Sequence, residues 1–458
     1  MLQQRKANDN GVQFSPIQSV SSWFVKTFKD GGLHGWLAVV GLFSSWMAWI
    51  GLIKGLAVML PTLQEQFNAS TWLVGWMIAI IDASMQISAL FASPLREKLG
   101  VRVVVMVSGL LVGGSLIASA FATSLSQITV LLTLAAGPAV GCSLIVSKEL
   151  VGRCFKEAST TAFGVGILGG SIAYVTCVPL TQFFLDVYGW RGTKLLFGAI
   201  LSHLAVCGAL MKEPVVKRSN DEYQTVAVNE DTDDGEATSN SRCCSCFNYG
   251  RSFISQTFKL GLFSLPSFWL IIFMCNIWKM MNIAWVIYFV VYTTVSKGFS
   301  LGDASNCVVS YGIGGILSSI TVGPLVKNLQ VLSLSNSAWL GLGLFLSSLY
   351  YLIDPWLMSF WPILVAAFIY GYFKVMVHIQ FDLVIIESFG ADRMGFFWGW
   401  NGLFTGVTGL FTLYLPGLIY DLYGSYTITF ILMGGVQLLT LIALLALVWQ
   451  RRRRPARL

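Results

Sequence analysis

Charged side chains occur inside stretches of this sequence that are otherwise almost wholly apolar. Seven of them share this setting with one histidine: Lys54, Asp82, Lys148, Glu149, Lys279, Lys374, Asp382 and His378. A charge in the hydrocarbon core of a bilayer is costly, so such residues normally face a polar cavity and bind or relay charge there. The pattern predicts a pathway for a polar solute through a membrane protein.

The tightest of these groups consists of Lys374, His378 and Asp382, which are spaced four residues apart. In a helix this spacing places each side chain one turn from the next, on one face. Histidine titrates near neutral pH. The group therefore predicts a proton site coupled to a substrate, or a row of side chains that docks an anion. The structural alternative is an ion pair with a neighbouring helix and a hydrogen-bonded histidine.

Lys54 lies well inside an apolar stretch and needs a counter-charge there. Asp82, on the next apolar stretch, is one candidate, and a substrate carboxylate is the other. Lys279 has Asn276 and Asn282 on the same helical face, and it allows the same two interpretations. We predict that Lys54, Lys279 and Asp82 belong to a substrate- or proton-binding site.

Lys148 and Glu149 are adjacent in the sequence. Neighbouring residues of a helix point about 100° apart, so these two cannot both face a cavity squarely. Arg153 follows about one turn later, close to the end of the apolar stretch. We predict a structural role for this charge pair.

The composition and the apolar runs indicate which secondary-structure elements hold these charged residues. The chain has 458 residues, 55% of them hydrophobic and 11% charged, with a mean hydropathy of +0.70. Apolar runs recur that are each long enough to cross a bilayer. The predicted spans are roughly 36–61, 72–94, 102–123, 126–151, 159–183, 193–211, 261–294, 306–326, 333–353, 358–385, 394–418 and 426–449. We expect an all-α membrane protein with twelve transmembrane helices in two groups of six.

Lysine and arginine are concentrated in alternate loops, which predicts that both termini are cytoplasmic. The net charge of +7 reflects this bias and does not indicate a nucleic-acid surface. Residues 1–35 are polar and do not resemble a cleavable signal peptide. No metal-ligand spacing, nucleotide-binding loop or nucleophile arrangement stands out, so no cofactor, no metal and no enzyme activity are predicted.

The predicted organisation has five parts. They are a cytoplasmic N-terminal segment (1–35), a first six-helix half (36–214), a flexible cytoplasmic linker (215–258), a second six-helix half (259–449) and a basic cytoplasmic tail (450–458). The linker contains an acidic run and the cysteines Cys243, Cys244 and Cys246, whose role the sequence leaves open.

The two halves resemble each other. The motif SPLREKLG at 93–100 corresponds to GPLVKN at 323–328. The lysines repeat as well: Lys54 with Lys279, and Lys148 with Lys374, at nearly equal offsets. Parallel six-helix repeats are typical of major facilitators, which bind substrate where the repeats meet, near the middle of the membrane.

Several segments resemble the monocarboxylate transporter family of the major facilitators. They are DGGLHGW at 30–36, QFNAS at 66–70, GVRVVVMVSG at 100–109, YGWRG at 188–192 and LIYDLYGSY at 418–426. The resemblance implies that Lys54 is the helix 1 lysine that binds the proton and carboxylate. The family's helix 8 aspartate and arginine, however, appear here as Gly315 and Ser319. A lysine such as Lys279 or Lys374 would have to replace that arginine.

The predicted function is alternating-access transport of small, monocarboxylate-type organic solutes, with proton coupling as one variant. Two alternatives remain open. One is facilitated diffusion of amino-acid-, creatine- or carnitine-like zwitterions; the other is a non-transporting membrane receptor or scaffold. The resemblance implies a plasma-membrane protein embedded in the lipid bilayer, and for some relatives a single-span ancillary glycoprotein as partner.

Overall fold

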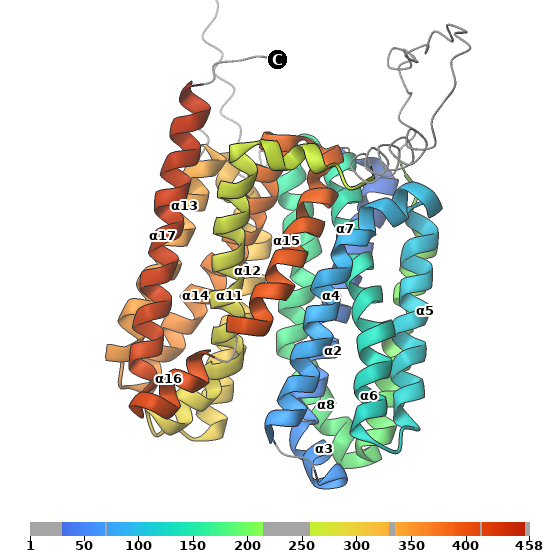
Figure 1. Ribbon diagram of the computed structural model, residues 1–458, viewed down its shortest axis with the longest axis vertical. Coiled ribbons are helices and arrows are strands. Elements are labelled where there is room, and N and C mark those ends of the chain that lie inside the picture. Colours follow the sequence, from blue (N-terminus) through green and yellow to red (C-terminus); the bar gives the residue numbers. More distant parts are fainter. Residues whose placement is uncertain (1–29, 69–70, 214–256, 329–334, 413–414, 454–458) are drawn as a thin grey trace, which may run out of the picture.

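The computed structural model describes residues 30–68, 71–213, 257–328, 335–412 and 415–453. Most of the predicted linker, with Cys243, Cys244 and Cys246, lies outside these residues, as does most of the predicted N-terminal segment. The face of the bundle at which the last helix ends in Arg451, Arg452 and Arg453 is called the tail face here; it is at the top of Figure 1.

The first group of helices corresponds to the first six predicted spans. It contains α2 (Gly32–Val58), α3 (Leu60–Phe67), α4 (Thr71–Leu99), α5 (Val101–Ala120), α6 (Leu125–Leu131), the π-helical turn η1 (Leu132–Ala136), α7 (Gly137–Cys154), α8 (Ser159–Ser202) and α9 (Leu204–Leu210). The long α8 is interrupted at Gly189, whose backbone has φ 66° and ψ 179°. Glycine tolerates this positive φ, so the chain turns sharply between two predicted spans.

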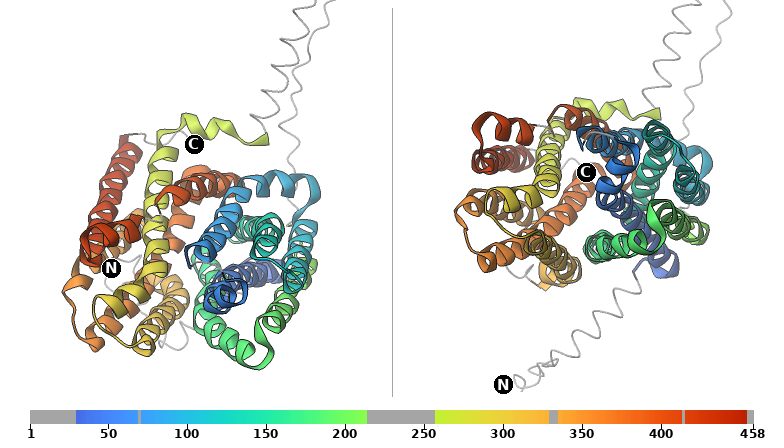
Figure 2. Two further views of the ribbon diagram at one scale, coloured as in Figure 1. Left: turned by 60° about the horizontal axis from the view of Figure 1, so that its bottom comes forward. Right: turned by 90° about the horizontal axis from the view of Figure 1, so that it is seen from below.

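The second group corresponds to the other six spans. It contains η3 (Leu260–Ser264), α11 (Pro266–Val295), α12 (Leu301–Asn328), α13 (Asn336–Ile353), η5 (Asp354–Trp356), α14 (Phe360–Phe389), α15 (Ala391–Thr412), α16 (Leu415–Tyr423) and α17 (Tyr426–Arg453). The two groups stand side by side, the first in blue to green and the second in yellow to red (Figures 1 and 2).

Eleven helices among the described residues are long and apolar enough to span a membrane. The helix α15 is not among them, so a twelfth span stays a prediction. Glycine recurs along α15, at Gly395, Gly399, Gly402, Gly406 and Gly409. These glycines lower its hydropathy and allow close packing against another helix, which suits an element at the interface between the two groups.

The two groups contact each other through glycines. A Cβ on Gly164 of α8 would lie 2.4 Å from the carbonyl oxygen of Ser319 on α12. A Cβ on Gly402 of α15 would lie 2.4 Å from the carbonyl oxygen of Gln86 on α4. The first contact lies toward the tail face and the second lies near the middle of α4 and α15, so the two halves are packed together in both regions.

The first family-like segment has a structural role at the tail face. The Asp30 carboxylate accepts hydrogen bonds from the backbone N–H groups of Glu157 and Ala158, at 3.0 and 2.8 Å. The Trp36 ring packs edge-on against Phe155, with 5.4 Å between centroids. Asp30 thereby holds the two residues that immediately precede α8. The motif joins the start of α2 to the turn between α7 and α8.

Candidate functional site

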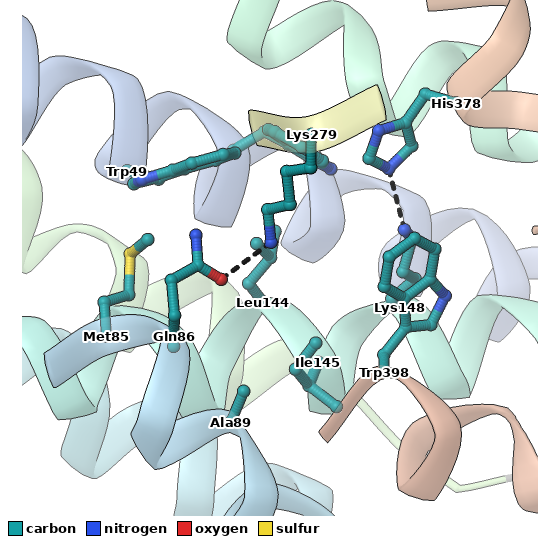
Figure 3. A pocket seen from close by; sticks show the side chains of 12 residues that line it. Trp49, Met85, Gln86, Ala89, Leu144, Ile145, Lys148, Lys279, His378 and Trp398 are labelled. Atoms are coloured by element: carbon teal, nitrogen blue, oxygen red, sulfur yellow. Dashed lines mark hydrogen bonds between the residues drawn. The ribbon is translucent and has the colours of Figure 1, made fainter. Parts of the chain in front are cut away.

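A small cavity lies between the two halves, near the middle of the helices. Its volume of about 40 Å³ has room for a few water molecules. It is lined by Trp46, Trp49, Met85, Gln86, Ala89, Gly141, Leu144, Ile145, Lys148, Lys279, His378 and Trp398. Figure 3 shows that Lys148 and Lys279 reach into this region from different helices. The lining is mostly apolar and aromatic with a few polar groups, as is usual for a small-molecule site.

Lys148 of α7 forms the most complete polar contact of the cavity. Its Nζ lies 2.9 Å from Oδ1 of Asp382 and 2.8 Å from Nε2 of His378, both on α14. Nζ also lies 3.8 Å from the ring centroid of Trp398, and the indole N–H of Trp398 donates to Asp382 Oδ1 at 2.9 Å. We call Lys148, His378, Asp382 and Trp398 the central lock, because it joins the first half to the second.

The hydrogen-bond geometry of the lock determines the state of its histidine. A lysine ammonium has donors only, so the Lys148 ammonium donates and Nε2 of His378 accepts. The imidazole is then neutral, with its proton on Nδ1. Its ring is stacked on Trp398 at 5.7 Å and meets Trp46 and Trp278 edge-on, at 5.0 and 5.4 Å. These aromatic contacts hold the imidazole in one orientation.

Lys279 of α11 makes a second contact between the halves. Its Nζ donates to Oε1 of Gln86 on α4 at 2.7 Å (Figure 3). Asp82, one turn before Gln86, accepts a hydrogen bond from the indole N–H of Trp49 at 3.2 Å. Asp82 therefore lies one turn from the partner of Lys279. The described contacts contain no ion pair of Asp82 with Lys279 or with Lys54, the predicted partner.

Lys54 and Lys374 differ from the other two lysines. Neither makes an ion pair or a hydrogen bond within the described part of the chain. Their Nζ atoms lie 5.4 and 5.7 Å from the ring centroid of Tyr174 on α8, and Lys374 Nζ lies 5.8 Å from that of Tyr311 on α12. Both side chains are partly exposed. Two ammonium groups from opposite halves therefore share one tyrosine.

Glu149 lies closer to the tail face and is fully buried. Its carboxylate pairs with Arg96 at 3.2 Å and Arg153 at 2.9 Å, and it accepts a hydrogen bond from Ser93 at 3.1 Å. Arg153 also pairs with Asp392 of α15 at 3.2 Å. Lys148 and Glu149 thus have separate partners: Lys148 belongs to the central lock, and Glu149 to an arginine cluster at the tail face.

Comparison with known proteins identifies the family to which the chain belongs. The family model described as Major Facilitator Superfamily matches residues 37–335, which is more than half of the chain. The chain belongs to the Major Facilitator Superfamily. It is therefore related to transport proteins rather than enzymes.

Individual relatives of this major facilitator chain are monocarboxylate transporters. Monocarboxylate transporter 12 of Rattus norvegicus is 26% identical over 429 residues, which cover 91% of this chain and 85% of the relative. Monocarboxylate transporter 11 of Mus musculus is 36% identical over 185 residues, 40% of this chain and 41% of the relative. Monocarboxylate transporter 1 of Homo sapiens is 32% identical over 186 residues, covering 41% and 37%. The family resemblance seen in the sequence is confirmed.

A solved structure agrees on the fold. The crystal structure of the E. coli fucose:proton symporter matches with a TM-score of 0.64 and 13% sequence identity, and covers 90% of this chain and 99% of the symporter. Together with the membrane-spanning helices, this confirms an all-α, multi-pass membrane protein with the major facilitator fold.

The family's helix 8 aspartate and arginine correspond to Gly315 and Ser319 on α12, and another helix packs against these two positions. A Cβ on Gly315 would lie 2.8 Å from Oγ of Ser171, and Ser319 is buried with its hydroxyl bonded to the Gly315 carbonyl oxygen at 2.9 Å. The helix α8 therefore packs directly on this part of α12. An arginine side chain has no space there. The positive charge of the cavity between the halves comes from lysines instead.

The structure separates the three residues predicted to share one face of α14. His378 and Asp382 meet Lys148, whereas Lys374 points to Tyr174 and Tyr311. Sequence reasoning missed the aromatic residues Trp398 and Tyr174, because an aromatic side chain in an apolar helix looks the same whether it faces lipid or a cavity. Gln86 was recoverable, since it lies one turn from Asp82 in an apolar span.

Proposed function

We propose that this protein is a secondary transporter that carries a small organic solute with a carboxylate across a membrane by alternating access. The observation that carries the proposal is the pair of uncompensated ammonium groups, Lys54 and Lys374, between the two halves. A partly buried ammonium without a counter-charge attracts anions, and a bound carboxylate would compensate its charge. The names of the relatives, monocarboxylate transporters, support the same class of solute.

Alternating access requires a contact that opens and closes, and the central lock is our candidate. Lys148 and Asp382 join the halves next to the cavity, while glycine contacts close the tail-face side. Opening toward the tail face must separate this ion pair. In our proposal the described conformation is the one closed toward the tail face.

Proton coupling follows from the same pair. Protonation of Asp382 would remove its negative charge and with it most of the attraction for Lys148. A proton that enters from the side opposite the tail face would thereby loosen the lock and favour the other conformation. His378, whose Nε2 already accepts from Lys148, lies beside this path.

The orientation and location belong to the same proposal. Arg451, Arg452 and Arg453 at the tail face fit the predicted cytoplasmic side, where lysine and arginine are enriched. We propose a plasma-membrane protein with both termini in the cytoplasm. A single-span glycoprotein partner stays a prediction.

Uptake measured in oocytes or proteoliposomes tests the proposal. A panel of carboxylates, amino acids and creatine is offered with and without a pH gradient, and at least one carboxylate should be taken up. Lys54→Ala should reduce its uptake at least about tenfold, the effect of losing about 1.4 kcal/mol of binding. Lys156→Ala, at an exposed lysine of the α7–α8 turn, is the control and should leave uptake unchanged.

Other results would change the interpretation. Uptake of only zwitterionic compounds would favour the uniporter alternative, and uptake of nothing would favour the receptor or scaffold. Unchanged carboxylate uptake by Lys54→Ala at normal surface amounts would contradict the assignment of Lys54.

A further inference from the structure

The charges between the two halves do not balance within the described residues, where four lysines face two aspartates. Lys148 is paired with Asp382, and Lys279 donates to Gln86, one turn from Asp82. Lys54 and Lys374 have no acidic neighbour of this kind. Both ammonium groups are partly shielded from solvent, and each favours an anionic partner. The site therefore lacks two negative charges rather than one.

The contacts with Tyr174 set an upper limit to the distance between the two ammonium groups. Each lies within 6 Å of the centroid of the same ring, that of Tyr174. The two Nζ atoms are thus no farther apart than the sum of those two distances. A dicarboxylate of four carbons, counting the carboxylate carbon at each end, is long enough to reach both Nζ atoms.

The surroundings of the two lysines suit such a molecule. Tyr174 and Tyr311 pack edge-on, with 5.6 Å between centroids, and they lie beside Lys374. Tyr311 accepts a hydrogen bond from Asn282 at 3.2 Å, which fixes its hydroxyl. The rings offer an apolar wall for a short carbon chain, and the ammonium groups offer a partner for a carboxylate at each end of it.

We propose that the preferred substrate is a small aliphatic dicarboxylate, with one carboxylate on Lys54 and the other on Lys374. This inference rests on the proposed function. It narrows the substrate from a solute with at least one carboxylate to a solute with two. A monocarboxylate can supply only one negative charge, so one of the two ammonium groups stays uncompensated. A dicarboxylate supplies both.

The positions of the lysines also explain how such a substrate would act on the fold. Lys54 belongs to α2 in the first half, and Lys374 belongs to α14 in the second. A dicarboxylate held at both ends links the two halves. A ligand can shift a conformational equilibrium only through contacts that differ between the states, and this link is such a contact.

The test compares two compounds of equal chain length. Uptake of radiolabelled succinate and butyrate is measured in proteoliposomes that contain the full-length protein. The native protein should take up succinate at least about tenfold faster than butyrate, which corresponds to one additional ion pair worth about 1.4 kcal/mol. Lys374→Gln should remove this preference: succinate uptake falls, while butyrate uptake is retained.

The controls separate a role in specificity from a role in folding. Lys374→Arg keeps the charge and should keep the preference for succinate. If Lys374→Gln lowered the uptake of both compounds equally at normal protein amounts, the specificity role would be refuted. Faster uptake of butyrate than succinate by the native protein would overturn the dicarboxylate inference and leave the proposed function intact. Failure of every carboxylate would overturn both.

Discussion

At the scale of single residues, the central lock contains a buried carboxylate whose two oxygen atoms differ in their partners. Asp382 is fully buried, and its Oδ1 atom receives both the Lys148 ammonium and the Trp398 indole N–H. Its Oδ2 atom has no hydrogen-bond partner among the described residues. Buried carboxylates normally have both oxygens satisfied, so Oδ2 is a natural position for a proton. The Oδ1 atom of Asp382 thus has two partners, and its Oδ2 atom is left without one among the described residues.

Asp382→Asn should therefore uncouple transport from the proton gradient. The amide imitates a protonated carboxyl group in its lack of charge and cannot titrate, so an inward proton gradient should no longer stimulate uptake. Substrate exchange, which needs no net proton movement, should persist. The measurement is uptake and exchange at equal and unequal pH on the two sides.

A matched variant checks this interpretation. Trp398→Phe removes one hydrogen bond to Asp382, a change of about 1 kcal/mol, but leaves the titrating carboxyl in place. It should keep the response to the gradient. A normal response in Asp382→Asn would mean that the proton binds elsewhere.

At the scale of elements, glycines decide how closely the two halves approach. Gly164 places α8 directly against the backbone of α12, and a Cβ at this position would lie only 2.4 Å from a carbonyl oxygen. Backbone atoms cannot move aside as a flexible side chain can. The packing on the tail-face side therefore depends on the absence of a side chain at this residue.

Gly164→Leu should force α8 and α12 apart and expose the cavity toward the tail face. Cys275 of α11 is fully buried and lies one turn from Lys279, which lines the cavity, so it can report this opening. Its alkylation by a maleimide, located by mass spectrometry, should rise severalfold, while uptake falls. Gly435→Leu on α17, where a Cβ would meet nothing within 4 Å, is the control and should change neither. Equal alkylation in both variants would refute the role of this contact.

The elements were largely predictable from the sequence, but the partners in the site were not. Long apolar runs define helices such as α5 and α17 because a span must be apolar along its whole length. The prediction that Lys374 and Asp382 share one helical face was less informative about their partners. Residues eight apart on a helix differ by about 80° in direction, enough for them to face different neighbours. Helix packing determines which neighbour each one meets, and a single sequence does not display that packing.

At the scale of the whole molecule, two ion pairs between described residues join the halves on the way to the tail face. The Lys148–Asp382 pair is buried on both sides. The Arg153–Asp392 pair is at the tail face, and its aspartate side chain is 83% exposed. Breaking a buried pair by removing one partner costs about 3–5 kcal/mol, whereas an exposed pair contributes about 0.2–1 kcal/mol. Of these two pairs, the central lock should therefore be the one whose disruption by a single substitution weakens the contact between the halves more.

Asp392→Asn should accordingly change the rate of transport less than about fivefold, since about 1 kcal/mol is the most that an exposed pair usually contributes. Alkylation of Cys275 should stay close to its native level. Lys148→Met, which leaves Asp382 buried without its cation, should instead lower both protein stability and transport strongly. The double variant Lys148→Met/Asp382→Leu should recover thermal stability, because an apolar pair can replace a buried ion pair, but not transport. A large effect of Asp392→Asn together with a small effect of Lys148→Met would place the main lock at the tail face instead.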